Sequence, residues 1–187
     1  MKVVIFGDSI TNGFGTDFKT QSDILKRTVE AKAPGVEVIL RGINGEDSYD
    51  GLTRLEVVAQ DEADVYVIFF GANDASTAHA VNTAEFLVNL TKMTERFGAP
   101  KTILLTPPLH NDATPDPTRS NKLVERFRES TLEVAKTTGA EVIDLYQAMR
   151  ESPEPLLLLK DDGLHFSKAG YELLSSLIAE RLKARVC

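Results

Sequence analysis

Cysteine is nearly absent from this sequence of 187 residues, because the only one is Cys187 at the last position. A single cysteine cannot form an internal disulfide, which favours a reducing compartment, and we expect a cytoplasmic protein. Histidine is also rare, with three residues. Two of them, His79 and His110, lack the spacing of metal ligands, so we expect no metal site.

Cofactor motifs, positive charge and long apolar runs are lacking too. The sequence contains neither a Walker A motif nor a Gly-x-Gly-x-x-Gly loop, and we expect no cofactor. The 21 Lys and Arg against 28 Asp and Glu give a net charge of −7, which argues against nucleic acid as a partner. The apolar stretches are too short to span a bilayer, and the N-terminus enters a predicted strand without a signal-peptide core. We therefore expect no membrane insertion.

Five short apolar runs predict buried strands. They are Val3–Phe6, Val36–Leu40, Val65–Phe70, Thr102–Leu105 and Val142–Leu145. Helical patterns lie between them, and this alternation predicts an α/β protein with a parallel sheet and helices on both of its faces. The length suits a single domain over residues 1–187, large enough to bury roughly 70% of the surface that the unfolded chain exposes.

Three amphipathic patterns predict helices between or after these strands. The first begins at the capping-box-like pair Asn82 and Glu85 and ends at Gly98, the second ends at Gly139, and the third begins at Ser167 as N-cap. Within each pattern the apolar residues recur at helical spacing and so form one face. These faces are Phe86, Leu90, Met93 and Phe97; Leu123, Phe127 and Val134; and Leu173, Leu174, Leu177, Ile178 and Leu182.

Ser9 follows the first predicted strand, within Gly7–Thr11 (GDSIT). The carboxyl ends of parallel strands are where open α/β sheets place their chemistry. A serine there is a candidate nucleophile if a base and an oxyanion hole reach it. The Gly-x-Ser-x-Gly elbow is absent, since Ile10 and Thr11 follow the serine. That absence argues against the α/β-hydrolase fold and leaves serine chemistry open.

His165 is the candidate base, because it alone of the histidines follows a carboxylate at i−3 in a glycine-containing turn, Asp162–His165 (DGLH). At this spacing Asp162 can reach the imidazole Nδ1–H, which leaves Nε2 for the serine. The adjacent Asp161 is an alternative partner. An isolated Asp-x-x-His is more often a surface turn, so the motif needs its partners to carry function.

Gly45 and Asn73 are candidate donors to an oxyanion, because each follows a predicted strand. A glycine lets a backbone amide approach a substrate closely, and asparagine offers two N–H donors without charge. Alone, Gly45 reads more readily as a turn glycine, and Asn73 reads equally as an Asx turn or a helix cap. The neighbouring acids Asp8 and Asp74 are expected to brace their turns.

Together, these segments resemble the four blocks of the GDSL, or SGNH, hydrolase family, in the family order. The blocks are Gly7–Ser9, Gly45, Gly71–Asp74 (GAND) and Asp162–His165. Surrounding residues are similar to the isoamyl acetate-hydrolysing esterase branch: Arg41–Gly45 (RGING), Phe69–Asp74 (FFGAND), Leu105–Leu109 (LTPPL) and Asp162–Ser167 (DGLHFS). The resemblance implies a flavodoxin-like three-layer α/β/α fold with five parallel strands.

The resemblance also implies roles for the candidate residues. Ser9 would be the nucleophile, His165 the base and Asp162 the orienting acid, because Asp162 rather than Asp161 fits the Asp-x-x-His block. The oxyanion hole would comprise the Ser9 N–H, the Gly45 N–H and the Asn73 side chain.

Apolar walls for the substrate are expected from Phe14, Leu109 and Phe166, although Phe166 fits a core position equally well. The proline-rich segment 106–117 predicts a loop after the fourth strand, and such loops often line sites. His110 lies in this loop and could line the pocket, but a solvent-exposed histidine is the favoured interpretation.

The sequence thus predicts a metal-independent serine esterase acting on small carboxylic esters through an acyl-enzyme. Alternatives on the same site are a carbohydrate O-deacetylase, a thioesterase, a lysophospholipase or an acyltransferase. A non-enzymatic alternative is a flavodoxin-like protein that binds a small ligand on its loops. The sequence does not indicate the oligomeric state.

Overall fold

The computed structural model describes residues 1–15 and 21–186, so Cys187 lies outside the described residues. Five parallel strands form one sheet in the order β2-β1-β3-β4-β5. This is the flavodoxin-like order, and it confirms the predicted fold class. The strands are β1 (Lys2–Gly7), β2 (Glu37–Gly42), β3 (Val65–Phe69), β4 (Thr102–Leu105) and β5 (Glu141–Ile143).

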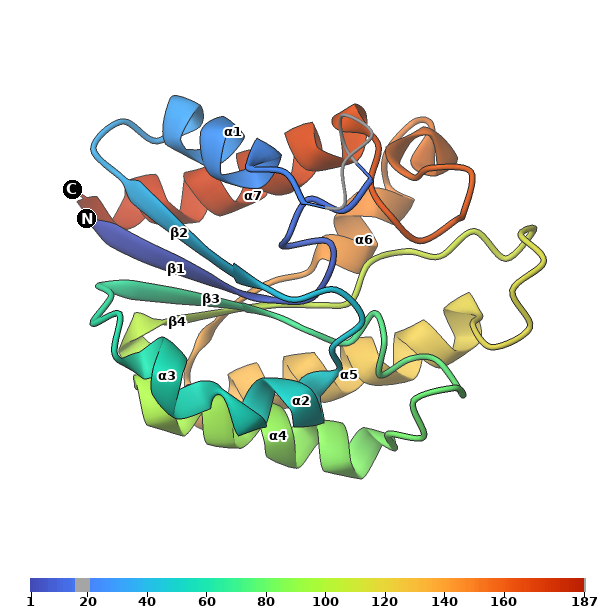
Figure 1. The fold of residues 1–187 in the computed structure, drawn as a ribbon, viewed down its shortest axis with the longest axis horizontal. Coiled ribbons are helices and arrows are strands. Elements are labelled where there is room, and N and C mark those ends of the chain that lie inside the picture. The colour runs from blue at the N-terminus through green and yellow to red at the C-terminus, as the bar shows by residue number, and fades with distance from the viewer. Residues whose placement is uncertain (16–20, 187) are drawn as a thin grey trace.

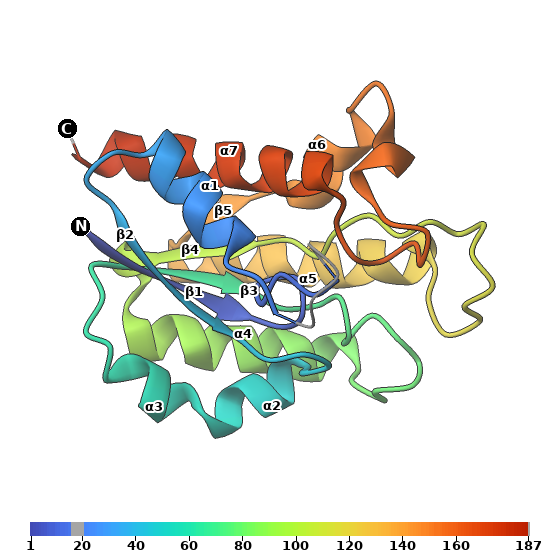
Figure 2. The same cartoon turned by 45° about the horizontal axis from the view of Figure 1, so that its top comes forward.

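Helices cover both faces of the sheet and form a three-layer arrangement (Figure 1). One face carries α1 (Ile24–Lys32) and α7 (Lys168–Val186), with α6 (Leu145–Arg150) beside α7 (Figure 2). The other face carries α2 (Ser48–Thr53), α3 (Leu55–Ala59), α4 (Thr83–Phe97) and α5 (Asn121–Thr138). Two short 3₁₀ helices, η2 (Ala99–Lys101) and η3 (Pro155–Leu158), complete the described elements. Over those elements, no helix combines the length and apolar character that a membrane span requires.

The fifth strand is shorter than predicted and ends at Ile143 instead of Leu145. Asp144 explains the early end, because its carboxylate accepts a hydrogen bond from the Gln147 N–H and caps α6. An apolar residue that follows such a cap continues into the helix, and Leu145 is fully buried as the first residue of α6.

The predicted helix signals hold at α4 and α7. The Asn82 side chain accepts from the N–H groups of Ala84 and Glu85, and the Glu85 carboxylate accepts from the Asn82 N–H, so the capping box is complete. The Ser167 hydroxyl accepts from the Gly170 N–H at the start of α7. Phe86, Leu90, Met93 and Phe97 are buried, as are Leu174, Ile178 and Leu182. Leu123, Leu173 and Leu177 are only partly buried at the edges of their helix faces.

Two buried carboxylates organise the loops at the carboxyl edge of the sheet. Asp8 accepts from the Ile10 N–H at 2.8 Å, and Asp74 accepts from the N–H groups of Ser48 at 3.0 Å and Gly71 at 3.1 Å. Burial raises the pKa of Asp8 to about 7 and that of Asp74 to about 6. Both acids brace turns, as predicted, and folding makes both easier to protonate than they are in the unfolded chain.

Protonation of Asp8 should therefore appear in the pH dependence of stability. The ordinary pKa of the side chain is 3.8, so between about pH 4 and pH 7 the folded state holds a proton that the unfolded state has released. This contribution to the free energy of unfolding falls as pH rises through that window. In urea titrations at pH 5 and pH 8, Asp8→Asn should lose less stability than the wild type over this interval. The exposed-site control Asp161→Asn should retain the wild-type difference, and an unchanged difference in Asp8→Asn would contradict the assignment.

Candidate active site

Ser9, His165 and Asp162 form a continuous hydrogen-bonded chain at the carboxyl edge of the sheet. The Ser9 Oγ lies 3.0 Å from His165 Nε2, and His165 Nδ1 lies 2.7 Å from Asp162 Oδ2. These separations are within hydrogen-bond reach for a nucleophile, a base and an orienting acid. Residues 156 positions apart in the sequence are thus brought together by the fold.

The turn before α7 explains why an acid three residues before the histidine can reach its ring. Asp162 Oδ1 accepts from the N–H groups of Leu164 and His165, both at 2.9 Å, and Gly163 adopts a φ of 71°. The other carboxylate oxygen is then directed at the imidazole. Asp161 is exposed, and the imidazole bonds to Asp162 instead.

Hydrogen bonds hold Asp162 as a carboxylate. Desolvation raises its pKa, but the hydrogen bonds from the His165 ring and from the two backbone N–H groups more than offset this, and the pKa lies well below its ordinary value. Its side chain is 47% exposed, whereas that of His165 is 14% exposed. The Asp162 carboxylate therefore orients the imidazole ring and remains in contact with water.

A small cavity of about 220 Å³ lies over this chain of residues. It is lined by Ser9, Phe14, Asn44, Gly45, Asn73, Arg119, Leu164 and His165. Polar groups from the loops after β1, β2 and β3 meet there with the Asp162–His165 turn. All the residues predicted for nucleophile, base and oxyanion hole line this cavity, and Asp162 stands behind the base.

Two backbone N–H groups are available at the cavity. Within the described part of the chain, the N–H groups of Ser9 and Gly45 donate to no protein acceptor. Gly45 adopts a φ of 81°, and a Cβ built there meets no atom within 4 Å. The glycine is therefore required by its backbone conformation, while the space beside it stays open.

The Asn73 side chain is held at both ends of its amide. Its Nδ2 donates to the Glu46 carbonyl at 2.8 Å, and its Oδ1 accepts from Arg119 Nη2 at 3.2 Å. Because Nδ2 carries two hydrogens, one N–H is left for a substrate atom. A helix cap or an Asx turn would need Asn73 Oδ1 to accept from a backbone N–H, whereas this oxygen accepts from Arg119, so neither alternative is what the structure shows.

Of the four predicted pocket residues, Phe14 alone lines the cavity, with its ring centroid 4.6 Å from that of His165. Phe166 is fully buried and packs edge-on against Tyr171 in the core, and Leu109 is 7% exposed. The expectation that His110 is solvent-exposed is wrong, because it is 2% exposed. The loop after β4 folds inward there: the Asn121 side chain bonds to both the N–H and the carbonyl of His110.

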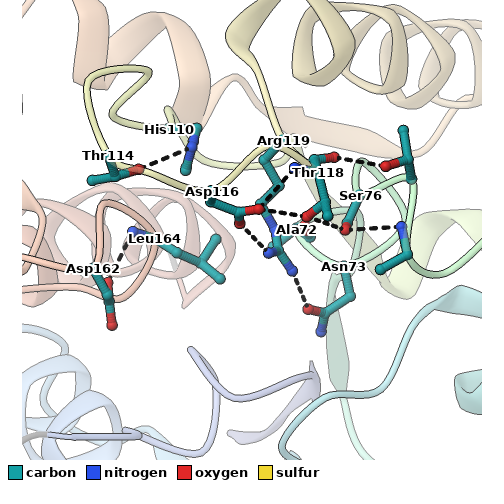
Figure 3. Close-up of polar contacts among 12 residues, drawn as sticks. Ala72, Asn73, Ser76, His110, Thr114, Asp116, Thr118, Arg119, Asp162 and Leu164 are labelled. Atoms are coloured by element: carbon teal, nitrogen blue, oxygen red, sulfur yellow. Dashed lines mark hydrogen bonds and ion pairs between the residues drawn. The ribbon is translucent and has the colours of Figure 1, made fainter.

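Three cavity residues are not predicted as site residues from the sequence. Asn44 and Leu164 lie inside the motifs Arg41–Gly45 and Asp162–His165, whereas Arg119 lies in the loop before α5, where a lone arginine has no distinguishing pattern. Arg119 reaches the cavity only because the loop returns to the end of β3 (Figure 3).

A larger hollow of about 540 Å³ lies beside the N-terminal ends of α2 and α4. It contains His79, which pairs with Asp47 at 3.1 Å, together with the apolar side chains of Tyr49 and Val88. Its described lining residues include no serine, threonine or cysteine, so this hollow lacks the pairing of a hydroxyl with a histidine that the smaller cavity has.

Comparison with known proteins identifies the family of this chain. A family model described as GDSL-like lipase/acylhydrolase matches residues 5–173. The isoamyl acetate-hydrolyzing esterase of Schizosaccharomyces pombe is 29% identical, with 98% of this chain aligned to 76% of that protein. A GDSL esterase/lipase of Arabidopsis thaliana is 27% identical, and the chain spans 64% of its length.

Solved structures that are similar to this chain include a lipase/acylhydrolase and an acetylxylan esterase. The lipase/acylhydrolase from Enterococcus faecalis is 40% identical with a TM-score of 0.91, covering 98% of this chain and 96% of that one. An acetylxylan esterase from Geobacillus stearothermophilus shares the fold, with a TM-score of 0.76 at 22% identity over 97% of this chain and 93% of that one.

The family match spans most of the chain, and the Enterococcus structure agrees with it over nearly its whole length. The chain belongs to the GDSL-like lipase/acylhydrolase family and is a hydrolase that acts on ester bonds.

Proposed function

We propose that Ser9, His165 and Asp162 hydrolyse small carboxylic esters through an acyl-enzyme. The observation that carries the proposal is the hydrogen-bonded chain from the Ser9 hydroxyl through the His165 ring to the Asp162 carboxylate, beside unused N–H donors. A protein that only binds a ligand requires no such alignment of a nucleophile with a base.

Acylation begins when the Ser9 Oγ attacks the ester carbonyl carbon and its proton passes to His165 Nε2. The carbonyl becomes a tetrahedral oxyanion. As it collapses, the bond to the alcohol oxygen breaks, and the imidazolium returns its proton to the departing alcohol. Asp162 stays ionised throughout, stabilises the imidazolium and keeps Nδ1 protonated, so Nε2 faces the serine.

Deacylation repeats these steps with water. Water attacks the acyl carbon while His165 Nε2 takes one of its protons, and the second oxyanion collapses by expelling the Ser9 oxygen. The imidazolium returns the proton to that oxygen, and the carboxylic acid leaves. The N–H groups of Ser9 and Gly45 and the Asn73 amide would stabilise both oxyanions, since they are already oriented and need no rearrangement.

The cavity favours a short acyl group. Its volume of about 220 Å³ is below the ~300–1,000 Å³ that is usual for drug-sized ligands, and its apolar walls are Phe14 and Leu164. The isoamyl acetate-hydrolyzing relative is named for a small acetate ester, which supports the same substrate class. An acetylated carbohydrate would present the same acetyl group on a larger alcohol, and a substrate panel separates these classes.

Removal of the nucleophile should abolish covalent labelling. Ser9→Ala should form no adduct with a fluorophosphonate probe by intact-mass measurement, because no activated hydroxyl remains, while its thermal unfolding should stay close to wild type. Ser176→Ala, whose hydroxyl bonds only within α7, should label like the wild type. The same adduct on Ser9→Ala would exclude Ser9 as the nucleophile.

The two adjacent acids should differ in their effect on kcat. His165→Ala should lower kcat by at least about 10³-fold, by analogy with other triads. Asp162→Asn should cost less, because water reaches its half-exposed carboxylate, and Asp161→Asn should be mild. Steady-state kinetics on a p-nitrophenyl ester would measure this. A larger loss in Asp161→Asn than in Asp162→Asn would mean that the orienting acid is misassigned.

Short acyl chains should be the best substrates. Each buried methylene contributes about 0.8 kcal/mol only where an apolar wall receives it, and the cavity offers few such walls. Across p-nitrophenyl esters from acetate to palmitate, kcat/KM should peak at acetate or butyrate and fall beyond about eight carbons. Val88→Ala, in the larger hollow, should leave this profile unchanged. A maximum at long chains would contradict the small acyl pocket, and a profile altered by Val88→Ala would place the acyl group in that hollow.

A further inference from the structure

Arg119 occupies an unusual position for an arginine, at the rim of the cavity with a side chain that is only 15% exposed. It directly precedes Ser120, the N-cap of α5, and its side chain runs back toward the end of β3 (Figure 3). The proposed acyl transfer does not require a cation at the rim of the cavity. The role of Arg119 is therefore inferred from its contacts.

The guanidinium joins the loop before α5 to the loop after β3. Nη1 pairs with Asp116 Oδ2 at 2.7 Å, Nη2 donates to Asn73 Oδ1 at 3.2 Å, and Nε donates weakly to the Ala72 carbonyl at 3.4 Å. A lysine could not make these contacts together, because only the planar fork of arginine offers several fixed N–H directions.

Asp116 is itself firmly held. Its Oδ1 accepts from the Thr118 N–H at 2.8 Å and from the Thr118 hydroxyl at 2.6 Å. These bonds, together with Arg119, lower the pKa of Asp116 to about 2, so the ion pair persists across the working pH range. Ser76 and Thr77 also form hydrogen bonds to Thr118. These bonds connect the segment 116–119 to the loop that carries Asn73.

The contacts also determine which way the Asn73 amide faces. A guanidinium can only donate, so the Asn73 atom that faces Arg119 must be the oxygen. A carbonyl can only accept, so the atom that faces Glu46 must be the nitrogen. The remaining N–H of Nδ2 is then fixed at the cavity.

We propose that Arg119 is a positioning residue, which holds the Asn73 amide so that its free N–H faces the oxyanion. The inference rests on the proposed function of Asn73 and deepens it. The bond to a cation also polarises the amide and strengthens its N–H as a donor. Arg119 acts through Asn73 and forms no bond to the substrate.

A double-mutant cycle tests this role. Asn73→Ala should lower kcat by ~10²–10³-fold with little change in KM, because its bond strengthens in the transition state. Arg119→Met keeps the apolar stem, removes every donor and should lower kcat by about 10- to 100-fold, also without a change in KM. In the Asn73→Ala background, Arg119→Met should reduce kcat by less than about threefold more.

Matched variants separate positioning from charge and from folding. Arg119→Lys keeps the positive charge but lacks the planar guanidinium. Its kcat should therefore be lowered nearly as much as that of Arg119→Met. Arg96→Ala, which removes a surface arginine paired with Glu56, should leave kcat unchanged. An additive cycle would overturn the proposal, and so would an Arg119→Met effect confined to KM, which would make Arg119 a substrate-binding group.

A second measurement does not depend on catalysis. The side-chain amide signals of Asn73, identified by their loss in Asn73→Ala, should shift or broaden in Arg119→Met in nitrogen–proton correlation spectra. Unchanged Asn73 signals would overturn the positioning role. Failure of the fluorophosphonate probe to label the wild type would instead refute the proposed function, while the spectra would still decide whether Arg119 holds Asn73.

Discussion

The alignment of β1 between β2 and β3 is the constraint on which the site depends. Gly7, the last residue of β1, pairs with Gly42 on one side and Phe69 on the other, so three strands end at one level. A Cβ at Gly7 would lie 2.3 Å from the Phe69 carbonyl oxygen, and only glycine allows this close approach. The loops that carry Ser9, Gly45 and Asn73 therefore leave the sheet side by side.

Two buried acids help to hold these loops in place. Asp8 braces the turn after β1, and Asp74 links the start of α2 to the turn after β3. Asp8 satisfies one backbone N–H and Asp74 two, which would otherwise be buried without a partner, at the cost of a desolvated carboxyl group. Uptake of a proton reduces that cost, which is why burial raises the pKa of both acids.

Much of this arrangement was predictable because it is local in the sequence. The presence and order of the five strands, the capping box at Asn82 and the spacing from Asp162 to His165 follow from short-range patterns, and the structure reproduces them, although several strand ends differ by one or two residues. Contacts formed by the long loop after β4 were not predictable. The burial of His110 depends on Asn121, and the contact of Arg119 with Asn73 spans 46 residues, so no short pattern encodes either.

That same loop connects the two halves of the site. At one end, the Asn111 N–H donates to the Gly163 carbonyl at 2.9 Å, within the turn that carries the base. At the other end, Arg119 donates to Asn73, which follows β3. Acyl transfer needs the base and the oxyanion donors at fixed positions around one carbonyl, and misplacement by about 1 Å can cost ~10²-fold in rate. A single loop that contacts both groups sets their separation more directly than the sheet, whose strands only bring them to the same edge.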